Sequence, residues 1–227
     1  EANVAVSLAN YGYDTEYVSA IPDNPIGDCA VAAPTLITFS AEVVGKAAHA
    51  GFAPEDGVHA IQVAAAAVAN LPSGRWGDVT VNVGTISGGR ATNIVPDSCT
   101  VTGEIRALCH QDALDRLNEI HSEFVEQAQA VDAKLNFNHT IHITGYRVDT
   151  DAPVAQRFKR ACAAVGVVPR FTDTYGGSDC NILSAHGIHG LVVATAMNNC
   201  HSVSEYTTVE ELCKAARLAQ ALMEKQD

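Results

Sequence analysis

The sequence lacks any apolar run of the roughly 20 residues that a helix needs to span a bilayer. Its first residues also lack the basic, then apolar, then small-residue order of a secretory signal peptide. The seven cysteines are odd in number and include no C-x-x-C pair, which indicates reduced thiols rather than a disulfide framework. Together, these absences predict a cytoplasmic protein.

Positive charge is also scarce. The 14 Lys and Arg residues face 26 Asp and Glu residues, for a net charge of −12. A nucleic acid or an anionic membrane would be repelled by this excess, so neither is expected as a partner. With 47% hydrophobic and 18% charged residues, the 227-residue chain has the composition of an ordinary globular protein with room for two modest domains.

From residue 34 onward, the hydrophobic pattern alternates between the periods of strands and helices. We expect strands over residues 36–44, 79–83, 99–106 and 135–143, and amphipathic helices over residues 55–71 and 113–130. The order strand, helix, strand, strand, helix, strand predicts a ferredoxin-like βαββαβ domain of two layers, covering residues 34–146.

Residues 147–227 show an α/β pattern, with helices over 153–165, 179–186 and 208–224 and short strands over 167–171 and 191–194. This amounts to about half of an α/β sheet. The predicted organisation has three segments: a leader of residues 1–33, the ferredoxin-like domain of residues 34–146, and a C-terminal α/β part of residues 147–227.

A segment of small residues, Gly45–Gly57 (GKAAHAGFAPEDG), joins the first strand to the first helix and carries His49. Small neighbours leave an imidazole accessible to a large ligand. Pro54, Glu55 and Asp56 indicate a helix start beside the same turn. On this spacing alone, an ordinary loop histidine explains His49 equally well.

Three further places carry residues suited to binding. Asn93 lies in a turn before the third strand, and Arg106 near the end of that strand has a planar guanidinium that suits a carboxylate or a carbonyl. Gly177 and Ser178 precede a helix, with Asp179 as a possible N-cap. His201 follows a buried strand. Taken singly, each also fits a turn former, an edge charge or a surface residue.

Taken together, these motifs resemble the zinc-dependent exopeptidases and amidohydrolases that include tripeptide aminopeptidase (peptidase T), carboxypeptidase G and aminoacylase. The resemblance covers residues 34–227 and is greatest to the peptidase-T-like branch. It rests on the Gly45–Gly57 motif, on GGSDCN at residues 176–181 and on CHSVSEY at residues 200–206. It implies a lid or dimerisation domain, a homodimer, and hydrolysis of small peptides or acylated amino acids at a dinuclear zinc site.

The resemblance also implies roles for individual residues. His49 would reach across the dimer to hold the substrate carbonyl or its oxyanion. Asn93 and Arg106 would bind the substrate together with the loop at Gly177 and Ser178. His201 would be the C-terminal zinc ligand.

One departure from the family concerns the metal. The family takes its remaining zinc ligands, several Asp, Glu and His residues, from before the lid, and no His precedes His49 here. A zinc ion needs three or four such ligands together. The pairs His139/His142 and His186/His189 do not replace them. We therefore expect an incomplete chain, the product of truncation, fusion or assembly error, that is weakly active or inactive alone.

Two other functions stay open. The chain is alternatively a non-catalytic dimerisation module. The third possibility is a sugar kinase, because EANVA at residues 1–5 and DNPIGD at residues 23–28 resemble the sugar-contacting helix and loop of ribokinase-like enzymes of the 2-keto-3-deoxygluconate kinase type. That resemblance covers only the 33-residue leader, which an amphipathic helix and a packed strand also explain.

Overall fold

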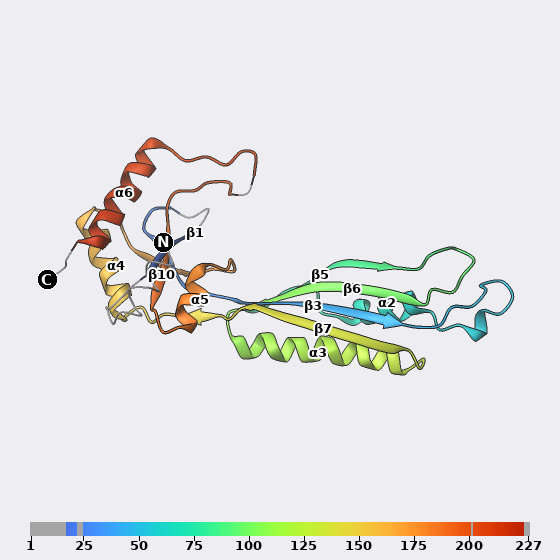
Figure 1. Ribbon diagram of the computed structural model, residues 1–227. Coiled ribbons are helices and arrows are strands. Elements are labelled where there is room, and N and C mark those ends of the chain that lie inside the picture. The colour runs from blue at the N-terminus through green and yellow to red at the C-terminus, as the bar shows by residue number, and fades with distance from the viewer. Residues whose placement is uncertain (1–16, 22–24, 201, 225–227) are drawn as a thin grey trace. The chain divides into compact units, whose positions relative to one another are not determined.

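A computed structural model describes residues 17–21, 25–200 and 202–224 of the chain (Figure 1). The chain divides into two compact units. We call residues 35–142 the inserted unit, and residues 1–34 together with 143–227 the flanking unit. None of the helices in the described part of the chain is both long and apolar enough to cross a membrane.

The inserted unit is a five-stranded antiparallel sheet with two helices. Its strand order is β4-β5-β6-β3-β7, with β6 antiparallel to both β3 and β5. Without the short β4, this is the strand order of the predicted ferredoxin-like fold, which is confirmed. The elements are β3 (Thr35–Val44), the one-turn 3-10 helix η1 (Pro54–Asp56), α2 (Ala60–Asn70), β4 (Gly74–Trp76), β5 (Val79–Gly88), β6 (Ser98–Ala107), α3 (His110–Gln129) and β7 (Lys134–Ile143).

The core of the inserted unit follows from alternation along its strands. Every second residue of β3 is buried, and the residues between them are half-buried on the opposite face. The buried face packs against α2 and α3, where Ala64, Ile120 and Phe124 are fully enclosed. A strand that buries one face in this way has apolar residues at every second position of its sequence, which is why these strands were predictable.

Helix α2 begins later than predicted. Pro54–Asp56 forms only a single 3-10 turn, and α2 starts at Ala60 with His59 as its N-cap. The reason is that Val58 pairs with Lys46 as a β-bridge, with N–H···O distances of 3.0 and 2.9 Å. Backbone groups engaged in an extended bridge cannot also join a helix, so the prediction of a continuous helix from Glu55 is wrong.

The flanking unit is an α/β unit with a five-stranded sheet. Strands β1, β10, β2 and β8 lie in that order, and β9 also pairs with β2. Helix α4 packs against α6 and β10, and α5 packs against β1, β8 and β10. The elements are β1 (Tyr17–Ile21), β2 (Asp28–Ala33), β8 (Tyr146–Arg147), α4 (Pro153–Ala164), β9 (Arg170–Asp173), α5 (Asp179–Ala185), β10 (Gly190–Ala194) and α6 (Val209–Met223).

Strand β2 changes the predicted division of the chain. All six of its residues are buried, and it pairs with β8, β9 and β10. Strand β1 pairs in parallel with β10. The segment predicted as a separate leader therefore supplies two strands to the sheet that also holds the C-terminal part. A central strand buried on both faces shows no alternation, so the pattern did not identify it.

Gly103 of β6 has no room for a side chain. It lies opposite Phe39 of β3, and a Cβ there would overlap the Phe39 ring and the Asn82 carbonyl oxygen. We expect Gly103→Ala to destabilise the inserted unit by about 1–3 kcal/mol, because the Phe39 ring must move in a packed core. Urea unfolding followed by the fluorescence of Trp76 measures this. Gly84→Ala is the matched control, since its Cβ has no contact closer than 3.8 Å; equal effects of the two changes would contradict the prediction.

Candidate functional site

Two loops form the tip of the inserted unit. One, residues 45–50, follows β3, and the other, residues 93–97, precedes the antiparallel strand β6. Backbone hydrogen bonds join them: Gly45 N–H donates to Asp97 O at 2.9 Å, Val95 N–H to Ala48 O at 2.9 Å, and Ala50 N–H to Asn93 O at 3.0 Å. The β3–β6 pairing thus continues past the sheet, and it brings the backbone segments that carry His49 and Asn93 side by side.

The tip is also held from its other side. Residue 46 pairs with Val58, and Ala60 N–H donates to Pro96 O at 2.9 Å. Gly45 permits this approach, since a Cβ on it would overlap the Val58 carbonyl oxygen. The loop that carries His49 is therefore fixed by backbone bonds on two sides rather than held by side chains.

The imidazole of His49 is exposed, and its tautomer follows from its partners. The backbone N–H groups of Gly51 and Phe52 both donate to Nδ1, at 3.1 and 3.2 Å. A nitrogen that accepts from two N–H groups carries no hydrogen, so the neutral ring has its hydrogen on Nε2. His49 therefore offers a hydrogen-bond donor at Nε2, which is the chemistry required to hold a carbonyl oxygen.

Asn93 and Arg106 do not lie together within one copy of the inserted unit. Asn93 is exposed in the tip, before Ser98. Arg106 pairs in register with Leu36 near the opposite end of β6, eight residues beyond Ser98, or about 26 Å along a strand. The prediction that both face one cleft therefore fails for a single inserted unit, because Arg106 lies near one end of β6 and Asn93 lies in the loop beyond its other end.

Arg106 is half-buried beside Glu104 of the same strand. Its Nε donates to Glu104 Oε1 at 2.9 Å, and the two side chains are 29% and 39% exposed. Residues two apart on a strand point to the same side, and here that side is the one away from the helices. The carboxylate thus holds the guanidinium against the open face of the sheet.

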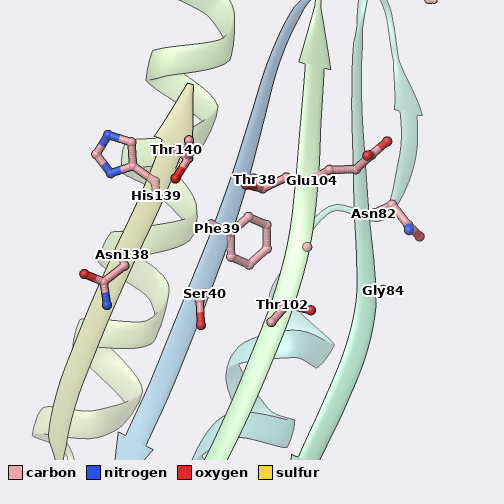
Figure 2. A pocket seen from close by; sticks show the side chains of 11 residues that line it. Thr38, Phe39, Ser40, Asn82, Gly84, Thr102, Glu104, Asn138, His139 and Thr140 are labelled. Carbon is pink, nitrogen blue, oxygen red and sulfur yellow. The ribbon is translucent and has the colours of Figure 1, made fainter. Parts of the chain in front are cut away.

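The open face of the sheet contains a shallow hollow of about 410 Å³ (Figure 2). Its rim consists mainly of hydroxyl and amide side chains from four strands, with Glu104 as a carboxylate. Some are already bonded, as Thr102 is to Thr85 at 2.6 Å. The alternating Thr, Ser and Asn residues were visible in the sequence, but nothing there indicated a shared surface. The polar residues that line it are Thr38, Ser40, Asn82, Thr102, Glu104, Asn138, His139 and Thr140.

In the flanking unit, the turn at Gly177 and Ser178 is determined by helix capping. Ser178, and not Asp179 as predicted, is the N-cap of α5: its Oγ accepts from Cys180 N–H at 3.2 Å, and its own N–H donates to Asn181 Oδ1 at 3.1 Å. At Gly177, a Cβ would overlap Ile143 Cδ1, so a side chain there would require the end of the Ile143 side chain to move. The Ser178 side chain thus has a structural role already.

Asn181 is a structural residue that stood out in the sequence only as part of the GGSDCN motif. It is 2% exposed, and its Nδ2 donates to the carbonyl oxygens of Pro34 at 3.1 Å and Thr144 at 2.9 Å. One amide therefore ties α5 to two chain segments that are far away in the sequence. Its burial and its four bonding sites explain why an Asn stands here.

Behind this turn lie groups that stay protonated. Burial raises the pKa of the Tyr146 hydroxyl and of the Cys180 thiol above their ordinary values. Burial likewise raises the pKa of Cys162 to about 11. At neutral pH these groups are uncharged, so none of them serves as a base or a thiolate nucleophile in this unit.

A metal centre is not formed by the described residues. His201, the predicted zinc ligand, lies outside them. Within residues 17–21, 25–200 and 202–224, no group of three or more His, Cys, Asp and Glu side chains is arranged to hold a metal ion. His142 bonds to Thr38 Oγ1 at 2.8 Å and His186 to Ile182 O at 2.8 Å, so these two rings serve local contacts.

Comparisons with known proteins relate this chain to the M20 peptidases. Residues 31–132 match the family model of the peptidase dimerisation domain, M20_dimer. The uncharacterized protein YqjE of Bacillus subtilis (strain 168) is 31% identical over 218 residues, which cover 96% of this chain and 57% of YqjE. This match takes in most of residues 1–33, so it does not support the kinase-like resemblance of that segment.

Solved structures have the same fold. The aminopeptidase PepT of Bacillus cereus ATCC 10987 is 32% identical with a TM-score of 0.88, over 98% of this chain and 60% of PepT. The B. subtilis protein YxeP, described as a dinuclear metal binding peptidase of the M20 family, is 17% identical with a TM-score of 0.75, over 97% of this chain and 60% of YxeP. The chain thus spans less than two thirds of the length of these relatives.

We predict that Asn181→Ala lowers the free energy of unfolding of the flanking unit by about 2–3 kcal/mol, because two carbonyl groups lose their donor inside the protein. Amide hydrogen exchange of β2 and α5 measures the stability of the flanking unit directly. Asn138→Ala, which removes an exposed amide from β7, is the control and should change stability by less than about 0.5 kcal/mol. Unchanged protection in the Asn181 variant would show that the bridge is dispensable.

Proposed function

We propose that this chain is the substrate-holding and dimerising part of a hydrolase that acts on small peptides or acylated amino acids. The observation that carries the proposal is the tip, where His49 presents an Nε2 donor beside Asn93. Backbone bonds hold this donor in place without any substrate. A donor fixed in advance stabilises an oxyanion without reorganisation. The relation to the M20 peptidases supports the choice of substrate class.

In this proposal, Asn93 and Arg106 serve different copies of the chain. About 26 Å of strand separates Arg106 from the tip, which is more than a dipeptide or an acylated amino acid spans. One small substrate that contacts both sets of residues therefore needs two copies. His49 and Asn93 of one copy would hold the substrate carbonyl, and Arg106 of the other would bind its carboxylate.

Only the similar proteins, and not the described residues of this chain, suggest a role for zinc. M20 neighbours include a dinuclear metal binding peptidase, and zinc there would activate water for attack on the carbonyl. The described residues of this chain do not fit such a centre, since they bring together no three suitable ligands. The same observation favours the second candidate, a non-catalytic dimerisation module.

The homodimer would form through the side of the inserted unit where β5 and α2 lie. Strand β4 pairs with β5 only at Val79–Val81, so Asn82–Gly88 forms the edge of the sheet. Helix α2 contains no charged residue, and Ala65 on it is exposed. Helix α3 instead carries Asp112, Asp115, Arg116, Glu119, Glu123 and Glu126. An uncharged helix beside an open edge suits pairing with a second copy.

A zinc and substrate assay tests the proposed function. With zinc added, we expect fewer than two tightly held ions per chain by mass spectrometry, and slow or absent hydrolysis of tripeptides and acyl-amino acids, because the ligands are too few. Tripeptides at millimolar concentration should still shift the amide resonances of Asn93 and Arg106. Two tightly held ions with ordinary turnover would refute the claim about the metal. Failure of every compound in the panel to bind would refute the substrate assignment.

Sedimentation tests the dimer. We expect a dimer at tens of micromolar, and Ala65→Arg should weaken it at least tenfold, since a charge buried between two copies of α2 lacks a partner. Ser122→Arg adds the same charge to the exposed side of α3 and should leave the dimer intact. A strict monomer, or equal weakening by both variants, would exclude this interface.

A further inference from the structure

Phe52 is an exposed aromatic residue in contact with His49. Its side chain is 85% exposed, and the centroids of the two rings lie 4.3 Å apart with 30° between their planes. Stacked or tilted rings at this separation attract each other beyond the area that they bury. A phenylalanine so exposed contributes little to a core, and its ring contact is with His49.

Phe52 touches the imidazole in a second way. Its backbone N–H donates to Nδ1 at 3.2 Å, next to the Gly51 N–H at 3.1 Å. The other side chains of residues 47–53 are methyl groups or hydrogen atoms, so they cannot restrain the plane of the ring. The backbone bonds fix which nitrogen carries the hydrogen, and the phenyl ring lies against the same imidazole.

We infer that Phe52 is a positioning residue for His49. Its phenyl ring covers one face of the imidazole and keeps the Nε2–H group directed away from the loop, toward the place where a carbonyl oxygen would bind. This inference rests on the proposed function only for the identity of the oxygen. The orientation of the ring is a property of the tip by itself.

Nitrogen NMR of the histidine rings tests the orientation in the full chain, without turnover. At about pH 8.5, where an ordinary imidazole is neutral, the wild-type protein should show His49 with its hydrogen on Nε2 and a rigid ring. In Phe52→Ala the ring-current shift of the His49 carbons disappears, and the order parameter of the ring falls below about 0.6. Phe52→Tyr, which keeps the aromatic face, restores both values.

Trp76→Ala is the control, because it removes another exposed aromatic side chain of the inserted unit, 59% exposed, from a different strand. It should leave the His49 spectrum unchanged. Because Phe52 is outside the core, its loss leaves no cavity, and the far-UV spectrum of Phe52→Ala should match that of the wild type. A His49 ring that is equally rigid in Phe52→Ala and in the wild type overturns the inference.

Hydrolysis provides an independent readout where the wild-type chain turns over a tripeptide. There, Phe52→Ala should lower kcat about fivefold to tenfold with little change in KM, since positioning acts on the transition state. Phe52→Tyr should restore kcat. An unchanged kcat counts against the inference. If the wild type shows no turnover, the proposed function is affected, and the NMR result alone decides the role of Phe52.

Discussion

Backbone pairing past the end of a strand ladder is the interaction on which the candidate site depends. The β3–β6 ladder runs over ten residue pairs, and three further hydrogen bonds continue it into the loops at residues 45–50 and 93–97. Because these bonds use only main-chain groups, the side chains of His49 and Asn93 remain available at the surface. A rigid scaffold that presents polar side chains on loops is the usual way in which proteins build binding sites.

The same ladder also separates the site residues. An extended strand of ten residues is about 33 Å long, so residues near its two ends cannot meet on one small ligand. Arg106 lies near one end of β6, and Asn93 lies in the loop beyond the other end. Because β6 is this long, a small substrate bound at the polar tip of one copy can reach Arg106 only in a second copy. It follows that, in our proposal, dimerisation is a condition for substrate binding rather than an addition to it.

In the flanking unit, hydrogen bonds from polar side chains join segments that are far apart in the sequence. Asn181 bonds to the carbonyls of Pro34 and Thr144, and Ser178 caps the helix on which Asn181 lies. Residues 176–181 therefore have a structural explanation that is complete without a ligand. These contacts show that Ser178 and Asn181 are first of all structural residues.

The sequence by itself determined the inserted unit almost entirely, because each of its strands buries one face and each long helix one stripe, and these leave periods of two and 3.6 along the chain. It also offered His49, which stands among small residues, and Asn93, which stands in a turn, as candidate site residues. Only the tertiary structure decided that β2 belongs to the sheet of the flanking unit, that Val58 delays the start of α2, and that Arg106 lies far from the tip. Each of these depends on pairing between distant segments. Such pairing is set by the contacts of the folded chain and leaves no local pattern in the residues that take part in it.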